Sequence, residues 1–478
     1  MEMLWSCLHF PDLPLGVFAR GNAQERPVVV SSVSHRPDVV AANGAAQRRG
    51  IVRGLSIAAA LALDSELSIH LRDERAETTA LKSIALWAGQ WTPTISIEPP
   101  ASLLMEISGC LNYFGGLDQL RDRIDTGLSA LGFSGVVATA PTALAASLFA
   151  RAGQAIAIEQ SADLAQRLAA LPIALLDHAQ AALDTLAGIG ARTLGDVMAL
   201  PRDGVARRFG QGLLDEIDRA RGNLPDARAL FVAPERYHGQ IELPLPVDET
   251  EALLFAAKRL VTELAGFLHG RGAGVTRLRC DLVHEDAKPT SIVLGLAATR
   301  RIEHIMIVMR ERLSREQLPD RVEAIRLVSE EIAPLAAKEG DFFPVTGKDS
   351  EAGAQLIERL RARLGEGAVL ALALRADHRP ELAWGQTPII SDATSSPKNN
   401  WGLSPIRPLW LLAEPRSLGA DPASTELKLL SGPERIETGW WDGDDIGRDY
   451  FVGRDRRGEE FWLYRDRGGQ WFVQGVFG

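Results

Sequence analysis

One carboxylate near the start of this chain, Asp12, has a residue type and position suited to metal chemistry. Asp12 follows an apolar stretch of strand type and lies between two prolines in LHFPDLPLGVFAR, residues 8–20. Divalent metal ions require several hard oxygen ligands, and enzymes that act on phosphates obtain them from carboxylates. The pattern therefore leaves three alternatives at Asp12: a metal site, a damaged metal site, or an ordinary turn.

A second candidate site lies in the helical segment LAGIGARTLGDVMAL, residues 186–200. One helix is expected to end near Gly188 and the next to begin at Thr193, with Gly190 and Arg192 between them. Glycines let a backbone approach a phosphate, and N–H groups at a helix start face an anion. This helix-hairpin-helix pattern predicts binding to the nucleic-acid backbone. A plain helical hairpin is the alternative.

A third candidate is a concentration of arginines in residues 270–330. Arg277 and Arg279 alternate on one predicted strand and so share a face, while Arg300 and Arg301 follow the next strand. Such a face is suited to binding successive phosphates of a nucleic-acid backbone. Acidic residues are interleaved with the arginines, so a solvated charged sheet face is the alternative.

Other short motifs fail. VTGKDS has Asp349 where a phosphate-binding loop needs Ser or Thr, and DGDDIG has Ile446 at a calcium-ligand position. GRGAG, residues 270–274, follows a helix and lacks dinucleotide-binding spacing. The histidines form no metal-binding pair, so neither a metal nor another cofactor is expected.

Length and composition limit the protein class. The chain has 478 residues, 46% hydrophobic and 24% charged, which predicts several globular domains. The formal net charge of −10 gives no global sign of nucleic-acid binding. Three distant cysteines match no zinc spacing and favour unpaired thiols in a reducing compartment. Neither a signal peptide nor a membrane span is expected.

The predicted elements that position these residues form an α+β chain of several domains. Short strands alternate with helices over residues 1–165, and the pattern is helical over 166–237. Strands and helices mix again over 238–335, and a Trp-, Gly- and Pro-rich β region ends the chain.

The order of these parts resembles the Y-family translesion DNA polymerases over about residues 4–335. The matching segments are LHFPDLPLGVFA, AANGAAQRRGIVRG, LLMEISGC with YFGG, VVATAPTALAA, and LAGIGARTLGDVMAL with RFGQGLLDEIDRARG. The resemblance implies a palm-like α/β domain interrupted by a fingers-like insert, then a helical thumb and a little-finger-like domain. The expected boundaries are 1–30 and 71–165 (palm), 31–70 (fingers), 166–237 (thumb), 238–335 (little finger), 336–367 (linker and short helix) and 368–478 (β-rich, partner-binding).

The resemblance also locates the catalytic positions, which are degenerate here. Active members bind two magnesium ions through carboxylates on adjacent palm strands. Those positions fall on Pro11 and Leu13 in the first strand, and on Ala101 and Ser102 in the second. Asp12 lies between the first two, where strand alternation is expected to point its side chain away.

The positions that hold the incoming triphosphate in active members are changed as well. The expected tyrosine and arginine fall on Gly44 and Gln47, and the expected lysines on Ala143 and Ser147. A polymerase-like chain that lacks the residues for binding metal and triphosphate is similar to the ImuB-type proteins, the catalytically inactive subunits of bacterial mutasomes.

This resemblance implies a non-catalytic DNA-binding adaptor in SOS-type translesion synthesis, associated with the nucleoid in the bacterial cytoplasm. The implied partners are primer-template DNA, the sliding clamp, an ImuA-type RecA-like protein and an error-prone C-family polymerase. A clamp-binding peptide is expected at EGDFFPV, with Phe342 and Phe343 as its apolar pair, although it lacks the usual glutamine and leucine. Packing of both rings on the little finger is the alternative.

The C-terminal aromatics are expected either to anchor partners or, for most of them, to form a small β core. They are Trp440, Trp441, Tyr450, Phe451, Trp462 and Tyr464. Two other functions stay open: an active Y-family polymerase with Asp12, Glu98 and Glu106 as unusual metal ligands, and a hairpin-containing DNA-binding protein unrelated to damage.

Overall fold

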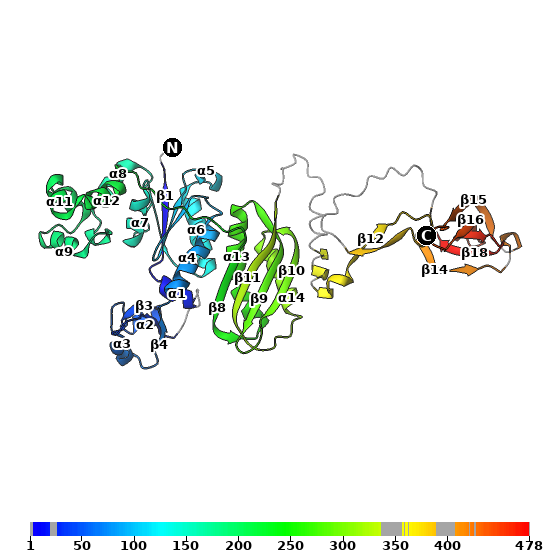
Figure 1. Ribbon diagram of the computed structural model, residues 1–478, viewed down its shortest axis with the longest axis horizontal. Helices are drawn as coiled ribbons and strands as arrows, with labels where there is room; N and C mark the ends of the chain where they lie inside the picture. Colours follow the sequence, from blue (N-terminus) through cyan, green and yellow to red (C-terminus); the bar gives the residue numbers. More distant parts are fainter. Residues whose placement is uncertain are drawn as a thin grey trace. The chain divides into compact units, whose positions relative to one another are not determined.

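The computed structural model describes residues 3–19, 26–335, 356–357, 359–361, 363–388, 407–419, 421–424 and 427–477. The chain divides into two compact units, Met1–Arg363 and Leu364–Gly478. Figure 1 follows their elements along the chain.

The first unit begins with a four-stranded antiparallel sheet, here called the N-terminal sheet. Alternate residues of its central strand point to opposite faces, so Cys7 packs toward α7 while Leu8 packs toward α4 and α6. The strands, in spatial order, are β5 (Ile95–Glu98), β6 (Ser102–Glu106), β1 (Trp5–His9) and β7 (Val136–Ala140). The helices are α1 (Leu13–Ala19), α4 (Glu74–Ala88), α5 (Leu111–Phe114), α6 (Leu117–Leu131) and α7 (Ala143–Arg151).

A separate small sheet has the spatial order β3-β2-β4. Its strands are β2 (Val28–Ser31), β3 (Val39–Ala42) and β4 (Ser68–Leu71), and its helices are α2 (Gly44–Arg48) and α3 (Ile57–Leu63). The side chain of Asn43 caps α2 and that of Ser56 caps α3. Residues 28–30, expected in the palm-like domain, belong to this sheet instead, because β2 pairs with β3 and β4.

Five helices follow and share one apolar core with α7. They are α8 (Ser161–Ala169), α9 (Gln180–Gly188), α10 (Leu194–Met198), α11 (Arg202–Phe209) and α12 (Gln211–Arg221).

A four-stranded antiparallel sheet, here called the middle sheet, follows in the first unit. Apolar residues at alternate positions of β9, such as Leu278, Cys280 and Leu282, pack on two helices that cover one face. The strands, in spatial order, are β10 (Thr290–Thr299), β9 (Ala273–His284), β11 (Val322–Pro334) and β8 (His238–Val247). The helices are α13 (Thr250–Gly270) and α14 (Ile302–Leu313).

Helix α13 also packs closely against α4 of the N-terminal part. A Cβ atom on Gly266 would lie 2.7 Å from both Cδ1 and the carbonyl oxygen of Trp87. A Cβ atom on Gly270 would lie 2.6 Å from the carbonyl oxygen of Gly89. The two glycines therefore allow the helix backbones to approach more closely than larger residues would.

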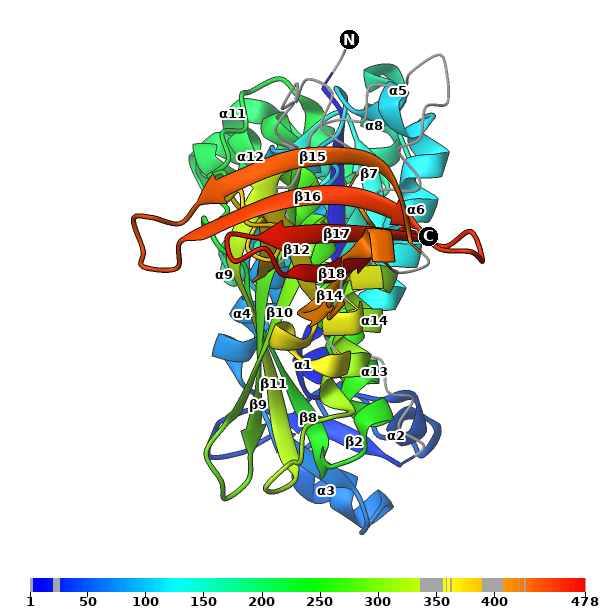
Figure 2. The ribbon, with the colours of Figure 1, turned by 90° about the vertical axis from the view of Figure 1, so that its right-hand side faces the viewer.

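The second unit contains two antiparallel sheets. The smaller pairs β12 (Leu370–Leu374) with β13 (Trp384–Pro388). The larger, here called the C-terminal sheet, is curved and seen face-on in Figure 2. Its strands, in spatial order, are β14 (Trp410–Ser417), β18 (Trp471–Val476), β17 (Glu460–Asp466), β16 (Ile446–Arg454) and β15 (Lys428–Thr438).

Several expectations are confirmed by these elements. The fold class is α+β with additional C-terminal β sheets, and Cys7, Cys110 and Cys280 are all free thiols. Among the described residues, no helix combines the length and apolarity that a membrane crossing requires.

The packing of α13 on α4 predicts a stability effect. Gly266→Ala should lower the free energy of unfolding of the first unit by about 1–3 kcal/mol, because Trp87 must move to admit the methyl group. Thermal unfolding of the purified chain measures this. Gly212→Ala in α12 is the matched control, since nothing lies within 4 Å of its Cβ position and it should be neutral or slightly stabilising. Equal losses in both variants would contradict the packing argument.

Candidate functional site

Most of the positions that correspond to a polymerase metal site meet at one end of the N-terminal sheet. His9 in β1 pairs with Ser102 in β6, and the N–H of Phe10 donates to the carbonyl oxygen of Ala101 at 2.8 Å. Pro11 follows directly. Pro11, Ala101 and Ser102 are thus close together as the alignment requires, and none of them carries a carboxylate.

Asp12 and Leu13 lie differently from the strand-based expectation. Strand β1 ends at His9, and Asp12 lies in an exposed turn. Its carbonyl oxygen accepts the N–H groups of Leu15 and Gly16 as α1 begins. Leu13 is only 1% exposed and packs in the core under the sheet. Strand alternation therefore does not decide where Asp12 points, because the strand has ended.

Neutral and cationic groups line the site together with one acid, Glu98, which pairs with Ser102 from the neighbouring strand. His9 Nδ1 and Ser102 Oγ are 2.8 Å apart. Burial, then the charges of Arg151 and Arg53, lower the pKa of His9 below its ordinary value. Burial, assisted by the charge of Glu98, raises the pKa of the Cys7 thiol to about 12, which leaves it protonated and unreactive at neutral pH.

The two glutamates do not join Asp12 in a metal site. Glu98 accepts from Arg228 at 2.9 Å and from the hydroxyl of Ser96 at 2.7 Å. Glu106 pairs with Trp5 at the opposite end of β1 from His9. Four residues of extended strand separate these ends, a distance of about 13 Å. In the parts of the chain that the structure describes, no three His, Cys, Asp or Glu residues form a group that could hold a metal ion.

The residues at the positions expected to bind a triphosphate have structural roles instead. Gln47 donates from Nε2 to the carbonyl oxygen of Ala42 at 2.8 Å, within the small sheet. Gly44 is the first residue of α2, and Ala143 and Ser147 are buried in α7. None of these four side chains carries the positive charge that would hold a triphosphate.

The predicted hairpin between α9 and α10 is present, with Gly190 at φ +93° and Gly188 as the last residue of α9. Asp196 Oδ2 accepts the N–H groups of Arg192 at 2.9 Å and Thr193 at 2.8 Å. The N–H of Asp196 in turn donates to Thr193 Oγ1, which completes a capping box. The N–H groups of Arg192 and Thr193 are therefore already bonded and not open to a phosphate in the unbound chain.

Arg277 and Arg279 lie on the face of the middle sheet that α13 and α14 leave uncovered. One carboxylate on the neighbouring strand binds both: Glu330 accepts from Arg277 at 2.8 Å and from Arg279 at 3.0 Å. Asp281 also accepts from Arg279, at 3.2 Å. The two arginines do share a face. Their positive charges are paired with carboxylates of the same sheet, so a phosphate must compete with Glu330 for them.

The remaining predicted site residues are more scattered. Arg300 is half-buried, while Arg301 is exposed and immediately precedes α14, where its N–H donates to Thr299. Phe342 and Phe343, the predicted clamp-binding pair, lie outside the described residues.

The C-terminal aromatics divide into two groups. Tyr450, Trp462 and Tyr464 are buried in the core of the C-terminal sheet, and the first two rings stack at 4.2 Å. Trp440 and Trp441 lie in the β15–β16 loop and are 77% and 56% exposed. Phe451 lies between these groups: it is half-buried, and its ring contacts Trp471 at 5.0 Å. The core role predicted for most of these rings thus applies to the first group, and of the six predicted aromatics the Trp440–Trp441 pair has the exposure of a partner anchor.

Three residues that shape these sites were not predicted from the sequence: Arg228, Asp196 and Glu330. Asp196 has a local signal, because a Thr followed three residues later by an acid matches the capping-box spacing. Arg228 and Glu330 have none, since their partners are 130 and 51 to 53 residues away.

The chain is similar to several known proteins. Residues 19–151 match the model of the impB/mucB/samB family. Protein ImuB from two strains of Caulobacter vibrioides is 26% identical over 460 residues, covering 90% of this chain and 100% of the relative. These matches support an ImuB-type protein. Because the match to ImuB covers 90% of the chain, it extends beyond the first unit into the C-terminal one.

Two solved structures with the same coverage are also similar. DinB from Sulfolobus solfataricus and the insertion ternary complex of Dbh DNA polymerase each have a TM-score of 0.40 and 16% identity to this chain. Each match covers 70% of this chain and 100% of the solved chain.

The pairing of Glu330 with two arginines predicts an unusual gain of DNA affinity. Glu330→Gln should release Arg277 and Arg279 for phosphate contacts, raising affinity several-fold and steepening the salt dependence by up to about 2 in log–log slope. Arg277→Gln with Arg279→Gln should do the opposite for all sequences alike. Fluorescence anisotropy with labelled duplex over a salt series measures both. Glu323→Gln removes one charge from the same strand; if it matches Glu330→Gln, only net charge matters.

The capping box predicts a pH dependence of the hairpin. Backbone and side-chain hydrogen bonds from Thr193 hold the pKa of Asp196 below its ordinary 3.8. The carboxylate therefore stabilises the hairpin above that value, and this contribution is lost as pH falls through the lowered pKa. Hydrogen exchange in α10 should be faster in Asp196→Ala than in the wild type at neutral pH, and the difference should vanish in acid. Asp184→Ala in α9 is the control; a difference that persists unchanged at low pH would exclude this role.

Proposed function

We propose that this chain is a non-catalytic DNA-binding adaptor in SOS-type translesion synthesis and induced mutagenesis. It acts at the nucleoid in the bacterial cytoplasm and bridges the sliding clamp, an ImuA-type RecA-like protein and an error-prone C-family polymerase. The matches to ImuB and to the impB/mucB/samB family support the broader part of this proposal, a role connected with DNA damage and translesion synthesis.

The proposal that the chain is non-catalytic rests on one observation. Pro11, Ala101 and Ser102 meet at the end of the N-terminal sheet where active relatives need carboxylates, and their side chains offer no anionic ligand. Two-metal catalysis requires charged oxygen ligands to hold the ions on both sides of the reacting phosphate. Glu98 is engaged by Arg228, and Glu106 lies at the far end of β1, which counts against the alternative of an active polymerase with substitute ligands.

Primer-template DNA is proposed to bind through its phosphates. Arg277 and Arg279 on the middle sheet supply the charge, with Arg192 at the hairpin and Arg300 and Arg301 beside the sheet as further contacts. Such contacts position a duplex without reading its sequence, which suits an adaptor that acts wherever synthesis stalls.

Protein partners are proposed to bind outside the polymerase-like part. Phe342 and Phe343 are the proposed clamp anchors. Trp440 and Trp441 are proposed as anchors for a second partner, because large exposed aromatics dominate binding energy when a partner buries them. The buried Arg379 ties their loop to the β12–β13 hairpin through ion pairs with Asp377 at 2.8 Å and Asp442 at 2.5 Å.

Primer extension tests the absence of catalysis. With magnesium or manganese, the full-length chain should bind a labelled primer-template but add no nucleotide in a template-dependent manner. Glu98→Gln, Glu106→Gln and Asp12→Asn should leave the outcome unchanged. Template-dependent incorporation that any of these substitutions abolishes would overturn the adaptor proposal.

Pull-down of purified clamp and C-family polymerase tests the bridging part. The full-length chain should retain both, and Phe342→Ala with Phe343→Ala should lose the clamp alone. Trp440→Ala with Trp441→Ala should keep the clamp and weaken the second partner. Undiminished clamp binding by the double phenylalanine variant would remove that segment from the proposal.

A further inference from the structure

Strand β4 is an exposed edge of the small sheet. The spatial order β3-β2-β4 leaves the side of β4 away from β2 without a partner strand among the described residues. The N–H groups of Ser68 and Arg72 donate to β2 and its flank, at 3.0 and 2.9 Å. Backbone groups alternate in direction along a strand, so the N–H and carbonyl groups of Ile69 and Leu71 point away from β2.

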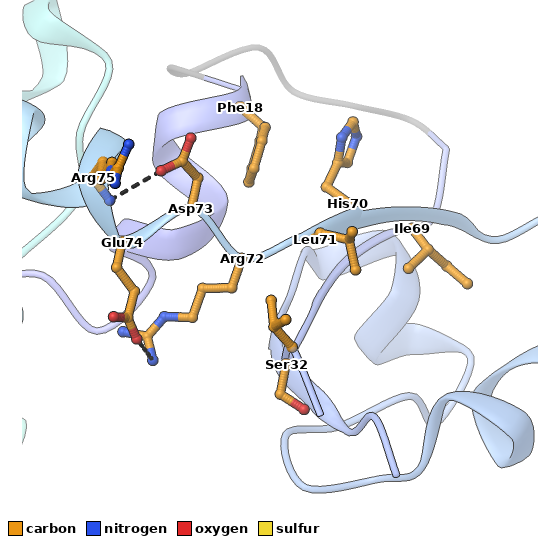
Figure 3. A pocket seen from close by; sticks show the side chains of 10 residues that line it. Phe18, Ser32, Ile69, His70, Leu71, Arg72, Asp73, Glu74 and Arg75 are labelled. Atoms are coloured by element: carbon orange, nitrogen blue, oxygen red, sulfur yellow. Dashed lines mark hydrogen bonds and ion pairs between the residues drawn. The ribbon is translucent and has the colours of Figure 1, made fainter. Parts of the chain in front are cut away.

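An open cavity of about 1000 Å³ adjoins this edge. Figure 3 shows its lining, with His70 and Phe18 on one side of β4 and Leu71 on the other. The rings of Phe18 and His70 stack at 4.7 Å. Leu71 and Val33 are 66% and 76% exposed, so large apolar side chains border the free backbone groups.

The apolar surface continues past Phe18. A second cavity of about 290 Å³ shares Phe18 with the first and is bordered by β8 and α13. Leu245 and Phe255 in its lining are 73% and 60% exposed. Extended apolar surface of this kind on a folded chain is typical of a site that another molecule covers.

The charges beside the cavity favour one acidic group in the occupant. Glu77 binds Arg72 at 2.8 Å and Glu74 binds it at 3.4 Å, while Asp73 accepts the N–H groups of Arg75 and Ala76 as the cap of α4. These carboxylates are therefore engaged. No ion pair found among the described residues includes the guanidinium of Arg75, which lines the same cavity. A carboxylate on the occupant would pair with it.

We propose that β4 receives an extended segment of a partner protein as an added strand. The segment has large apolar residues at alternate positions, which lie on one face of the added strand and fill the cavity beside Phe18, and one acidic residue that pairs with Arg75. An added strand satisfies the outward backbone groups of Ile69 and Leu71, which a docked helix does not. Nucleic acid fits poorly, because the surface is apolar and flanked by carboxylates. The proposal does not rest on the clamp anchors or on DNA binding.

A displayed library of nine-residue peptides, selected on the full-length chain without DNA, tests the proposal. Selected peptides should share alternating apolar residues with an acidic position, and their binding should protect the 68–72 amides from hydrogen exchange. Ile69→Pro removes one outward N–H and keeps the N–H groups that pair with β2, so it should weaken binding about tenfold or more. N-methylation of the peptide backbone should weaken it similarly.

Arg75→Gln should weaken only peptides that carry the acidic residue, whereas Lys82→Gln, on the same helix but outside the cavity, should change nothing. DNA affinity measured in the same variants should be unaffected, so this proposal and the DNA-binding function can fail separately. Selection of no peptide above unselected sequences would overturn the proposal. The proposal would also be overturned by peptides that bind the Ile69→Pro and Arg75→Gln variants with wild-type affinity, or by peptides that protect no amide in β4.

Discussion

The close packing of α13 against α4 is the contact on which the arrangement of the first unit depends. Helix α4 belongs to the N-terminal core, and the 21-residue α13 forms the core of the middle sheet. Gly266 and Gly270 let the two helices approach until Trp87 and Gly89 fill the space that side chains would occupy. On its other side, α13 binds the sheet through the buried Glu263, which accepts the hydroxyl of Tyr237 at 2.9 Å. The contact therefore joins the N-terminal sheet, which carries the degenerate catalytic positions, to the middle sheet, which carries Arg277 and Arg279.

Two of the proposed DNA contacts, the hairpin backbone and the arginine pair of the middle sheet, are compensated within the chain. Asp196 occupies the N–H groups of the hairpin, and Glu330 binds both arginines of the middle sheet. A phosphate that arrives must exchange with a carboxylate rather than fill an empty site. Since these pairs are partly exposed, each exchange changes the free energy of binding by little. Binding through several weak exchanges remains sensitive to salt, which suits the proposed adaptor role.

The sequence was sufficient where structure follows from local pattern. Alternation placed Arg277 and Arg279 on one face, and glycine spacing located the α9–α10 hairpin. The sequence was not sufficient where residues far apart in the chain determine the structure. Which sheet β2 joins depends on β4, about 40 residues later, and Glu330 reaches the arginines through a strand register that no local pattern records. Strand alternation was also applied to Asp12, although β1 ends at His9 and Asp12 lies in the turn before α1.

The loss of acids at the end of the N-terminal sheet also has an energetic consequence for the fold. Carboxylates gathered for two metal ions repel one another when the metals are absent, so such a site is held together at a cost in stability. Pro11, Ala101 and Ser102 remove that repulsion, and the contact between His9 and Ser102 links β1 to β6 without metal. Two arginine charges near His9 would further disfavour its protonated form. Neutral residues at these positions therefore spare the fold this repulsion, which is compatible with the proposed adaptor role.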